Sequence, residues 1–379
     1  MFLVHGLLVA TWVSRIPAIK SRLGLSDAML GLTLLSGAIG AVFAIPFAGK
    51  FVNRYGSRKI TTVSSVALCL VLVLPALATN AQTLAAALFV FCATAAVMDV
   101  SMNAQGVEIE KRLAGPTMSR FHAMFSLGGM IGAGIGGVVA ARSIPPLAHF
   151  GVSAVAYLPA IILVAPLLLA THQGIGPQEN RLPLKRIPRA LLALSGISFC
   201  ILLSEGAMAD WTAVYLRQVL NAGGGIAAAG YSVFSAGMAL FRLLGDMITA
   251  RLGPARTVRT GSLVAACGMT WALLARSPWW ALPGFAAAGA GFSVIIPLIF
   301  GGGGRVESVS PGAGIATVTG IGYIGFIAGP PAIGFASQVV TLRYALGLVV
   351  ACCVLTSLLS GFVTGIQAPK ERALTEAYS

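Results

Sequence analysis

Acidic and polar side chains interrupt segments of this chain that are otherwise apolar. The stretch AAVMDVSMNAQGVEIEKR, residues 95–112, brings Asp99 and Asn103 directly after a run of alanine and larger apolar residues. Their four-residue spacing places the carboxyl and the amide on one face of a helix. A charge in apolar surroundings is costly unless it is paired or used. The pair therefore predicts a site that binds a polar solute or holds a proton, whereas Glu108 to Arg112 fit an ordinary solvated helix end.

Asp99 has three candidate partners. His122 lies about as far beyond the chain reversal expected near residue 111 as Asp99 lies before it, so a helical hairpin would put both groups at similar depth. A carboxylate and an imidazole in one cavity can pass a proton near neutral pH. His5 and Glu205 are the other candidates, because they occupy matching places in two similar segments. His122 alternatively serves as a structural hydrogen-bonding group and Glu205 as half of an internal ion pair, and the choice stays open.

Long apolar blocks must position these residues. Of the 379 residues, 57% are hydrophobic and 9% are charged, whereas soluble domains contain about 25% charged residues. Blocks of about twenty apolar residues match the length that a helix needs to cross a bilayer. We expect an all-α membrane protein with twelve spans, at 2–19, 27–48, 60–79, 83–107, 117–141, 151–171, 190–216, 226–248, 257–276, 279–303, 312–336 and 343–366.

The net charge of +14 is distributed in short basic clusters between the apolar blocks. Such clusters set the orientation of membrane proteins, so the charge indicates a lipid bilayer as partner and not nucleic acid. Most of the basic residues fall on one side if the N-terminus is cytoplasmic, with inner loops that include 49–59 and 108–116. We therefore expect both termini to be cytoplasmic.

The longest polar interruption, 172–189, divides the chain into two halves of six spans. We expect an N-terminal half at 1–171, a cytoplasmic linker, a C-terminal half at 190–366 and a cytoplasmic tail at 367–379. Two pairs of segments repeat between the halves: HGLLVATW (5–12) with EGAMADW (205–211), and GLTLLSGAIG (31–40) with GYSVFSAGMA (230–239). Parallel repeats of this kind indicate a transporter whose site lies between the halves.

Other charged residues within the spans have structural interpretations. Arg242 and Asp246 lie at i,i+4 spacing, which favours an ion pair, so we expect a structural or gating contact between them. A substrate carboxylate is the alternative partner for Arg242. Asp210 precedes Trp211, which fits an anchor at the membrane interface. Aromatic residues that could stack on a sugar are Trp12, Phe125, Tyr215, Tyr231, Phe234, Phe292 and Tyr323.

Signals of catalysis are missing from the sequence. It contains no Gly-x-Ser-x-Gly elbow, no cluster of metal ligands and no nucleotide loop, since no Lys-Ser or Lys-Thr follows the glycines at 301–304. We expect no enzymatic activity, no catalytic residues, no metal and no cofactor. Energy for any transport must then come from a gradient or from the solute itself.

The segment GKFVNRYGSRK (49–59) resembles the loop between helices two and three of the major facilitator superfamily, which reads G-x-x-x-D-R-x-G-R-R. The resemblance implies the major facilitator fold, with twelve helices in two pseudo-symmetric halves. It also implies an inner gate built on this loop, here Asn53, Arg54 and Arg58. Asn53 replaces the usual aspartate, and a neutral amide is a weaker partner for basic groups than a carboxylate.

Three stretches, HG…W…RIP, DVSMNAQG and EGAMADW, together resemble a bacterial branch of this superfamily related to fucose permease. The resemblance implies that Asp99 takes part in sugar binding and proton coupling and that Asn103 hydrogen-bonds the solute. The first span offers His5 and Trp12 where that permease has a second acid, and Glu205 is the residue that could fill this gap.

The expected function is proton-coupled symport of a small, sugar-like polar solute by alternating access, carried out by a monomer in the bacterial inner membrane. Proton-driven export of amphipathic compounds is the alternative. Drug exporters of the superfamily end a glycine-rich motif of helix five with proline, but GGMIGAGIGG (128–137) lacks it and prolines occur in 322–334 instead. A sensor without transport activity is a third class, and the longest loop leaves no room within it for a soluble domain.

Overall fold

The computed structural model describes four stretches of the chain, namely 1–113, 117–170, 187–306 and 309–366. Within them the chain forms helices and short turns, with no strand. The predicted linker 172–189 lies mostly outside the described residues, and the predicted tail 367–379 lies wholly outside them.

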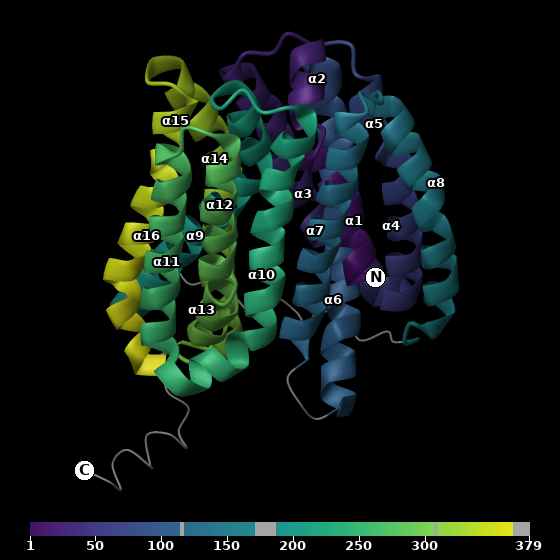
Figure 1. Cartoon of the computed structure of the whole chain (residues 1–379). Coiled ribbons are helices and arrows are strands. Elements are labelled where there is room, and N and C mark those ends of the chain that lie inside the picture. The colour runs from purple at the N-terminus through teal and green to yellow at the C-terminus, as the bar shows by residue number, and fades with distance from the viewer. Residues whose placement is uncertain (114–116, 171–186, 307–308, 367–379) are drawn as a thin grey trace, which may run out of the picture.

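Twelve crossings account for the described helices, and several crossings are two helices separated by a bend (Figure 1). In chain order they are α1 (Phe2–Val13) with α2 (Ile16–Arg22), α3 (Asp27–Tyr55), α4 (Ser57–Val71) with α5 (Leu74–Leu77), α6 (Ala81–Leu113), α7 (Met118–Ala141), α8 (Pro146–Val164) with η1 (Ala165–Leu167), α9 (Arg189–Gln218), α10 (Gly224–Leu252), α11 (Pro254–Leu274), α12 (Pro278–Phe292) with α13 (Ile295–Gly303), α14 (Pro311–Val339), and α15 (Leu342–Ala345) with α16 (Gly347–Leu359) and η3 (Ser360–Ile366).

Eleven of these crossings, all within the described residues, are long and apolar enough to span a membrane. The twelfth is α11, which has 21 residues and carries Arg256 and Arg259 in its first turns. It packs against α12 and α16 inside the same group of helices. The prediction of twelve spans in an all-α membrane protein is thus confirmed.

Several helices extend beyond the predicted membrane edges. The segment 49–59, which we predicted to be a loop, consists of the last turns of α3, Gly56 and the first turn of α4. Similarly, α6 continues to Leu113, and its Glu108 and Arg112 form an i,i+4 ion pair of 3.2 Å. Hydropathy marks only the apolar part of a helix, whereas polar turns beyond it can keep the same backbone hydrogen bonds. Both loop predictions were therefore wrong in this respect.

The repeat between the halves is visible in the backbone. α3 and α10 each have 29 residues. Each ends at a glycine with positive φ, 83° at Gly56 and 76° at Gly253, and the next helix begins directly after it. Residues with a Cβ atom rarely adopt this conformation, so each glycine permits the sharp turn between two crossings.

Two helix pairs make the most extensive contacts between the N-terminal and the C-terminal group of helices: α7 with α10, and α3 with α14. In Figure 1, α7 and α10 lie side by side in the middle of the bundle. Small residues allow this approach, because a Cβ atom on Gly137 would lie 2.9 Å from the carbonyl oxygen of Gly225, and one on Gly31 would lie 2.8 Å from that of Pro330. Close packing through glycine is typical of membrane helices.

Candidate functional site

Asp99 and Asn103 lie on one face of α6, as their spacing predicts. The side-chain amide of Asn103 donates to the Asp99 carbonyl oxygen at 2.9 Å and to the Asp99 carboxylate at 3.1 Å. Both side chains are only half-buried. Tyr323 of α14 is close enough to Asp99 to interact electrostatically. The carboxylate is therefore held by its own helix and faces a tyrosine from the opposite half.

Arg242 of α10 reaches across to α7. Its Nη1 donates to the Ser126 hydroxyl at 2.8 Å and to the His122 carbonyl oxygen at 3.4 Å, and its Nε donates to the Ser293 carbonyl oxygen at 3.3 Å. The predicted ion pair with Asp246 is wrong, since the only ion pairs within 4.0 Å among the described residues involve other groups. Spacing along α10 permits that pair, but α7 offers Arg242 acceptors inside the bundle while Asp246 is exposed.

Glu205 of α9 is the second acid of the interior. Its Oε1 atom is buried and has no hydrogen-bond partner. Arg242 and Tyr231, both on α10, are close enough to interact with it electrostatically. A buried carboxylate oxygen without a donor is costly, so this position favours an added proton or a hydrogen-bonding solute.

Asp210, one to two turns further along α9, also faces the interior. It interacts electrostatically with Tyr231 of α10 and with Cys92 of α6. Trp211 is completely buried and its indole nitrogen has no partner. The predicted interfacial anchor is wrong, because both side chains lie within the bundle. In the sequence, Asp210 lies only five residues after Glu205, which could have suggested an interior position. The neighbouring Trp211 favoured the interfacial interpretation instead.

The two predicted histidines lie close to one another. His5 is 5% exposed, neither ring nitrogen has a partner, and its ring packs on Phe125 with 5.3 Å between centroids. His122 is close enough to interact electrostatically with His5 and with Arg242. In the described part of the chain, the hydrogen-bond partner of the Asp99 carboxylate is Asn103, and none of His122, His5 and Glu205 takes that place.

Aromatic candidates separate into two groups. Trp12 is 4% exposed and belongs to the apolar core, and Tyr215 donates to the Ala272 carbonyl oxygen at 3.1 Å from a fully buried position. Packing explains both. Tyr231, which is also buried, and Tyr323 instead lie close enough to the interior acids to interact with them electrostatically.

The predicted gate residues Asn53, Arg54 and Arg58 are exposed at the end of α3 and the start of α4. The Arg54 guanidinium lies 5.2 Å from the centre of the Tyr55 ring. Neither arginine forms an ion pair with another described residue. Their gating role remains a prediction from the resemblance.

The opposite end of the bundle, at α2, carries a contact that the sequence analysis missed. Lys20 of α2 and Asp27 of α3 form a buried ion pair of 3.0 Å. With its amide oxygen turned toward Lys20, Gln218 of α9 accepts from Lys20 at 2.6 Å and donates to Asp27 at 3.2 Å. The three groups connect the two halves at this end of the bundle. The sequence indication of this contact was a base and an acid, Lys20 and Asp27, on either side of one short turn.

Together, α6, α7, α9, α10 and α14 bring carboxylates, an arginine and tyrosines from both halves into the membrane interior. Among the described residues there is no group of three or more His, Cys, Asp or Glu that could hold a metal ion. Carboxylates, amides and hydroxyls of this kind can hydrogen-bond a polar solute, and a carboxylate can also carry a proton.

Sequence relatives agree with this arrangement. A family profile described as Major Facilitator Superfamily matches residues 1–302. An uncharacterised transporter of this type from Yersinia pestis is 36% identical over 352 residues, covering 92% of this chain and 90% of its own. The membrane protein MosC of Rhizobium meliloti is 32% identical over 359 residues, covering 93% and 87%.

Solved structures share the fold. The nucleoside transporter NupG superposes with a TM-score of 0.66 at 14% identity, over 96% of each chain. FucP in its outward conformation superposes with a TM-score of 0.61 at 16% identity, over 95% of this chain and 97% of that one. Helix content, interior charges and sequence relatives therefore lead to one conclusion: this chain belongs to the major facilitator superfamily and is a multi-pass membrane transporter, not an enzyme.

Proposed function

We propose that this protein is a secondary active transporter that takes up a small, sugar-like polar solute together with protons. The observation that carries the proposal is Glu205, whose buried oxygen lacks a donor beside an arginine that hydrogen-bonds the other half. Protonation of Glu205 removes a negative charge next to Arg242, and a hydrogen-bonding solute supplies the missing donor. Because two of the three hydrogen-bond partners of Arg242 lie on α7, that charge is linked to the relative position of the two halves.

Alternating access supplies the mechanism. In transporters built from two repeats, the halves rock about a site near the bilayer midplane. A ligand shifts such an equilibrium only by as much as its affinity differs between the two states. Arg242 meets this requirement, since its bonds to Ser126 and His122 depend on how α10 sits against α7. The Lys20, Asp27 and Gln218 contact would open in the alternate state.

The polar groups support a hydroxyl-rich solute. Asp99 and Asn103 offer acceptors and a donor from one half, Tyr323 of the other half lies close to Asp99, and Glu205 of that half lies close to Arg242. NupG, of the same fold, is a nucleoside transporter, and a nucleoside contains a sugar ring. The distribution of basic residues favours an inner membrane location with both termini cytoplasmic, and we propose that the monomer is the working unit.

Uptake into proteoliposomes with an imposed pH gradient tests the proposal. Hexoses, polyols and nucleosides are the solutes to screen. We expect accumulation when the interior is alkaline and loss of accumulation with an uncoupler. Uptake that ignores both the gradient and the uncoupler would contradict proton coupling, and gradient-driven export of amphipathic compounds would favour the antiporter instead.

Asp99→Asn is the matching variant. The amide keeps a similar shape but cannot carry the proton, so we expect gradient-driven uptake to disappear while solute exchange at equal pH continues. Exchange and uptake that fall together would assign Asp99 to solute binding alone, and unchanged uptake would remove it from the site.

A further inference from the structure

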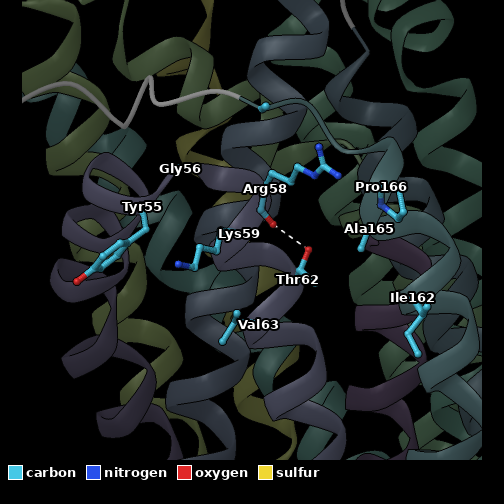
Figure 2. Close-up of a pocket in the computed structure, with 10 residues that line it drawn as sticks. Tyr55, Gly56, Arg58, Lys59, Thr62, Val63, Ile162, Ala165 and Pro166 are labelled. Atoms are coloured by element: carbon cyan, nitrogen blue, oxygen red, sulfur yellow. Dashed lines mark hydrogen bonds between the residues drawn. The ribbon is translucent and has the colours of Figure 1, made fainter.

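A crevice of about 540 Å³ lies outside the central site, between the start of α4 and the end of α8. Figure 2 shows its two walls. The α4 wall includes Arg58, Lys59, Thr62 and Val63, and the facing wall is apolar, formed by Ile162, Ala165 and Pro166.

Gln105 of α6 fixes the separation of these walls. Its amide nitrogen donates to the Ser57 hydroxyl at 2.6 Å and to the Leu169 carbonyl oxygen at 2.7 Å, and its amide oxygen accepts from the Leu169 backbone N–H at 2.8 Å. Ser57 begins α4, and Leu169 follows η1. The crevice is therefore built into the fold by a buried side chain and does not depend on surface side chains alone.

The apolar wall faces lipid. Ile162 is 64% exposed on α8 and Val63 is 57% exposed on α4, although both belong to membrane-spanning segments. The α8 surface continues with Leu163 at 73% and Leu167 at 78%. Exposed apolar side chains on membrane-spanning helices contact lipid acyl chains. The apolar side of the crevice is therefore open to the bilayer, and Arg58 and Lys59 lie at its polar end.

The charge of this crevice is positive and unmatched. In Figure 2 the Arg58 side chain extends toward Pro166 on the facing wall, while Lys59 lies over the Tyr55 ring, 5.5 Å from its centre. Neither forms an ion pair with a described residue.

The two helices on either side of the crevice, α4 and α8, contain no acidic residue. The chain contains no Asp or Glu between Asp27 and Asp99 or within 111–170. Glu108, near the end of the neighbouring α6, is already paired with Arg112. A neutralising anion must therefore come from outside these helices.

We propose that this crevice binds an anionic phospholipid, with its phosphate at Arg58 and Lys59 and an acyl chain along Val63 and Ile162. Basic pockets between membrane helices recognise lipid headgroups in this way. A free phosphate ion would match the charge but leave the apolar wall without a partner. A zwitterionic lipid would match the wall but bring its own cation to the basic edge.

Native mass spectrometry of the purified full-length protein tests the site. The probes are phosphatidylglycerol and phosphatidylcholine with identical acyl chains, and inorganic phosphate as a competitor. We expect the wild type to bind phosphatidylglycerol at least about tenfold more tightly than phosphatidylcholine, and Arg58→Ala with Lys59→Ala to reduce that preference roughly tenfold or more. Phosphate should compete only weakly, because it lacks the chain.

The other half offers a matched control. The turn at Gly253 has the same backbone geometry, and Arg251 and Arg256 flank it. Arg251→Ala with Arg256→Ala removes the same charge and should leave the phosphatidylglycerol preference unchanged. Ile162→Asn tests the apolar wall and should weaken lipid binding but not phosphate binding.

Three results would overturn the proposal. They are equal affinity of the wild type for both lipids, full displacement of phosphatidylglycerol by phosphate, and equal losses in the Arg58/Lys59 and Arg251/Arg256 variants. Unfolding temperatures in detergent identify variants that failed to fold, and Arg58→Gln, which removes the charge but keeps a polar side chain, then replaces the double variant.

Discussion

Asp99 on α6 and Arg242 on α10 are both charged groups within membrane-spanning helices, but they find their partners in different places. Asp99 accepts a hydrogen bond from Asn103 one turn along its own helix. Arg242 donates to Ser126 and His122 on a helix of the other half. Movement of one half against the other would leave the first contact intact and break the second.

This difference suggests different roles for the surroundings of Asp99, in the N-terminal half, and those of Arg242, in the C-terminal half. The bond between Asn103 and Asp99 lies within one helix and does not depend on the relative position of the halves, which suits a group that recognises a solute or holds a proton. The Arg242 side changes its partners with the state, and Glu205 beside it lacks a donor for one buried oxygen. Only a group whose contacts differ between states can couple binding to movement, so we place the coupling on the C-terminal side.

Arg242→Gln should have the largest effect and is the strongest test of this comparison. Hydrogen bonds from a charged donor contribute about 1.5–3 kcal/mol each, and two of those of Arg242 reach α7, so we expect transport to fall on the order of 100-fold or more. Uptake into proteoliposomes measures the effect. Arg242→Lys is the control, since it keeps the charge but not the planar fork, and it should retain partial activity. Normal transport by Arg242→Gln would contradict a coupling role for Arg242 and the C-terminal half.

Glu205→Gln should abolish gradient-driven uptake and at the same time raise stability. The variant replaces a carboxylate, whose charge is costly away from water, with a neutral amide of similar shape, which relieves part of that cost. Unfolding temperature in detergent and uptake with a pH gradient measure the two effects. Asp99→Asn is the comparison, because its carboxylate already has a donor and its removal should bring no such gain. A loss of stability in Glu205→Gln would show that Arg242 compensates the charge fully.

Asn103→Ala and Ser126→Ala give the smallest and most direct contrast. Each removes one hydrogen bond to a charged group, within a helix in the first case and between halves in the second. We expect Asn103→Ala to weaken solute binding a few-fold with little effect on the exchange rate, and Ser126→Ala to slow exchange with little effect on binding. Binding titrations and exchange rates at equal pH separate the two. Identical profiles would mean that the two sides work alike.

The sequence predicted what depends on one helix and failed where a second helix competes. Hydropathy gave the twelve crossings, and the four-residue spacing gave the contact between Asp99 and Asn103. The same spacing wrongly paired Arg242 with Asp246, because it carries no information about Ser126 on α7.

Gln105 illustrates the same limit. It lies two residues beyond Asn103 on α6 and points away from the Asp99 face, so nothing in the local pattern marks it. Its importance comes from Ser57 and Leu169, which are 48 and 64 residues away along the chain. Such contacts become visible only when the helices are assembled.

The equal lengths of α3 and α10 limit how this chain can change over evolutionary time. One residue inserted into either helix would rotate everything beyond it by about 100° and shift it by about 1.5 Å. An insertion before Gly31 in α3 would move it away from Pro330, and one before Arg242 in α10 would turn that side chain away from α7. Substitutions can accumulate on the lipid-facing surface at little cost, but insertions and deletions within these two helices should be eliminated. The lengths of α3 and α10, which end at Gly56 and Gly253, are therefore a more durable record of common ancestry than the identities of their residues.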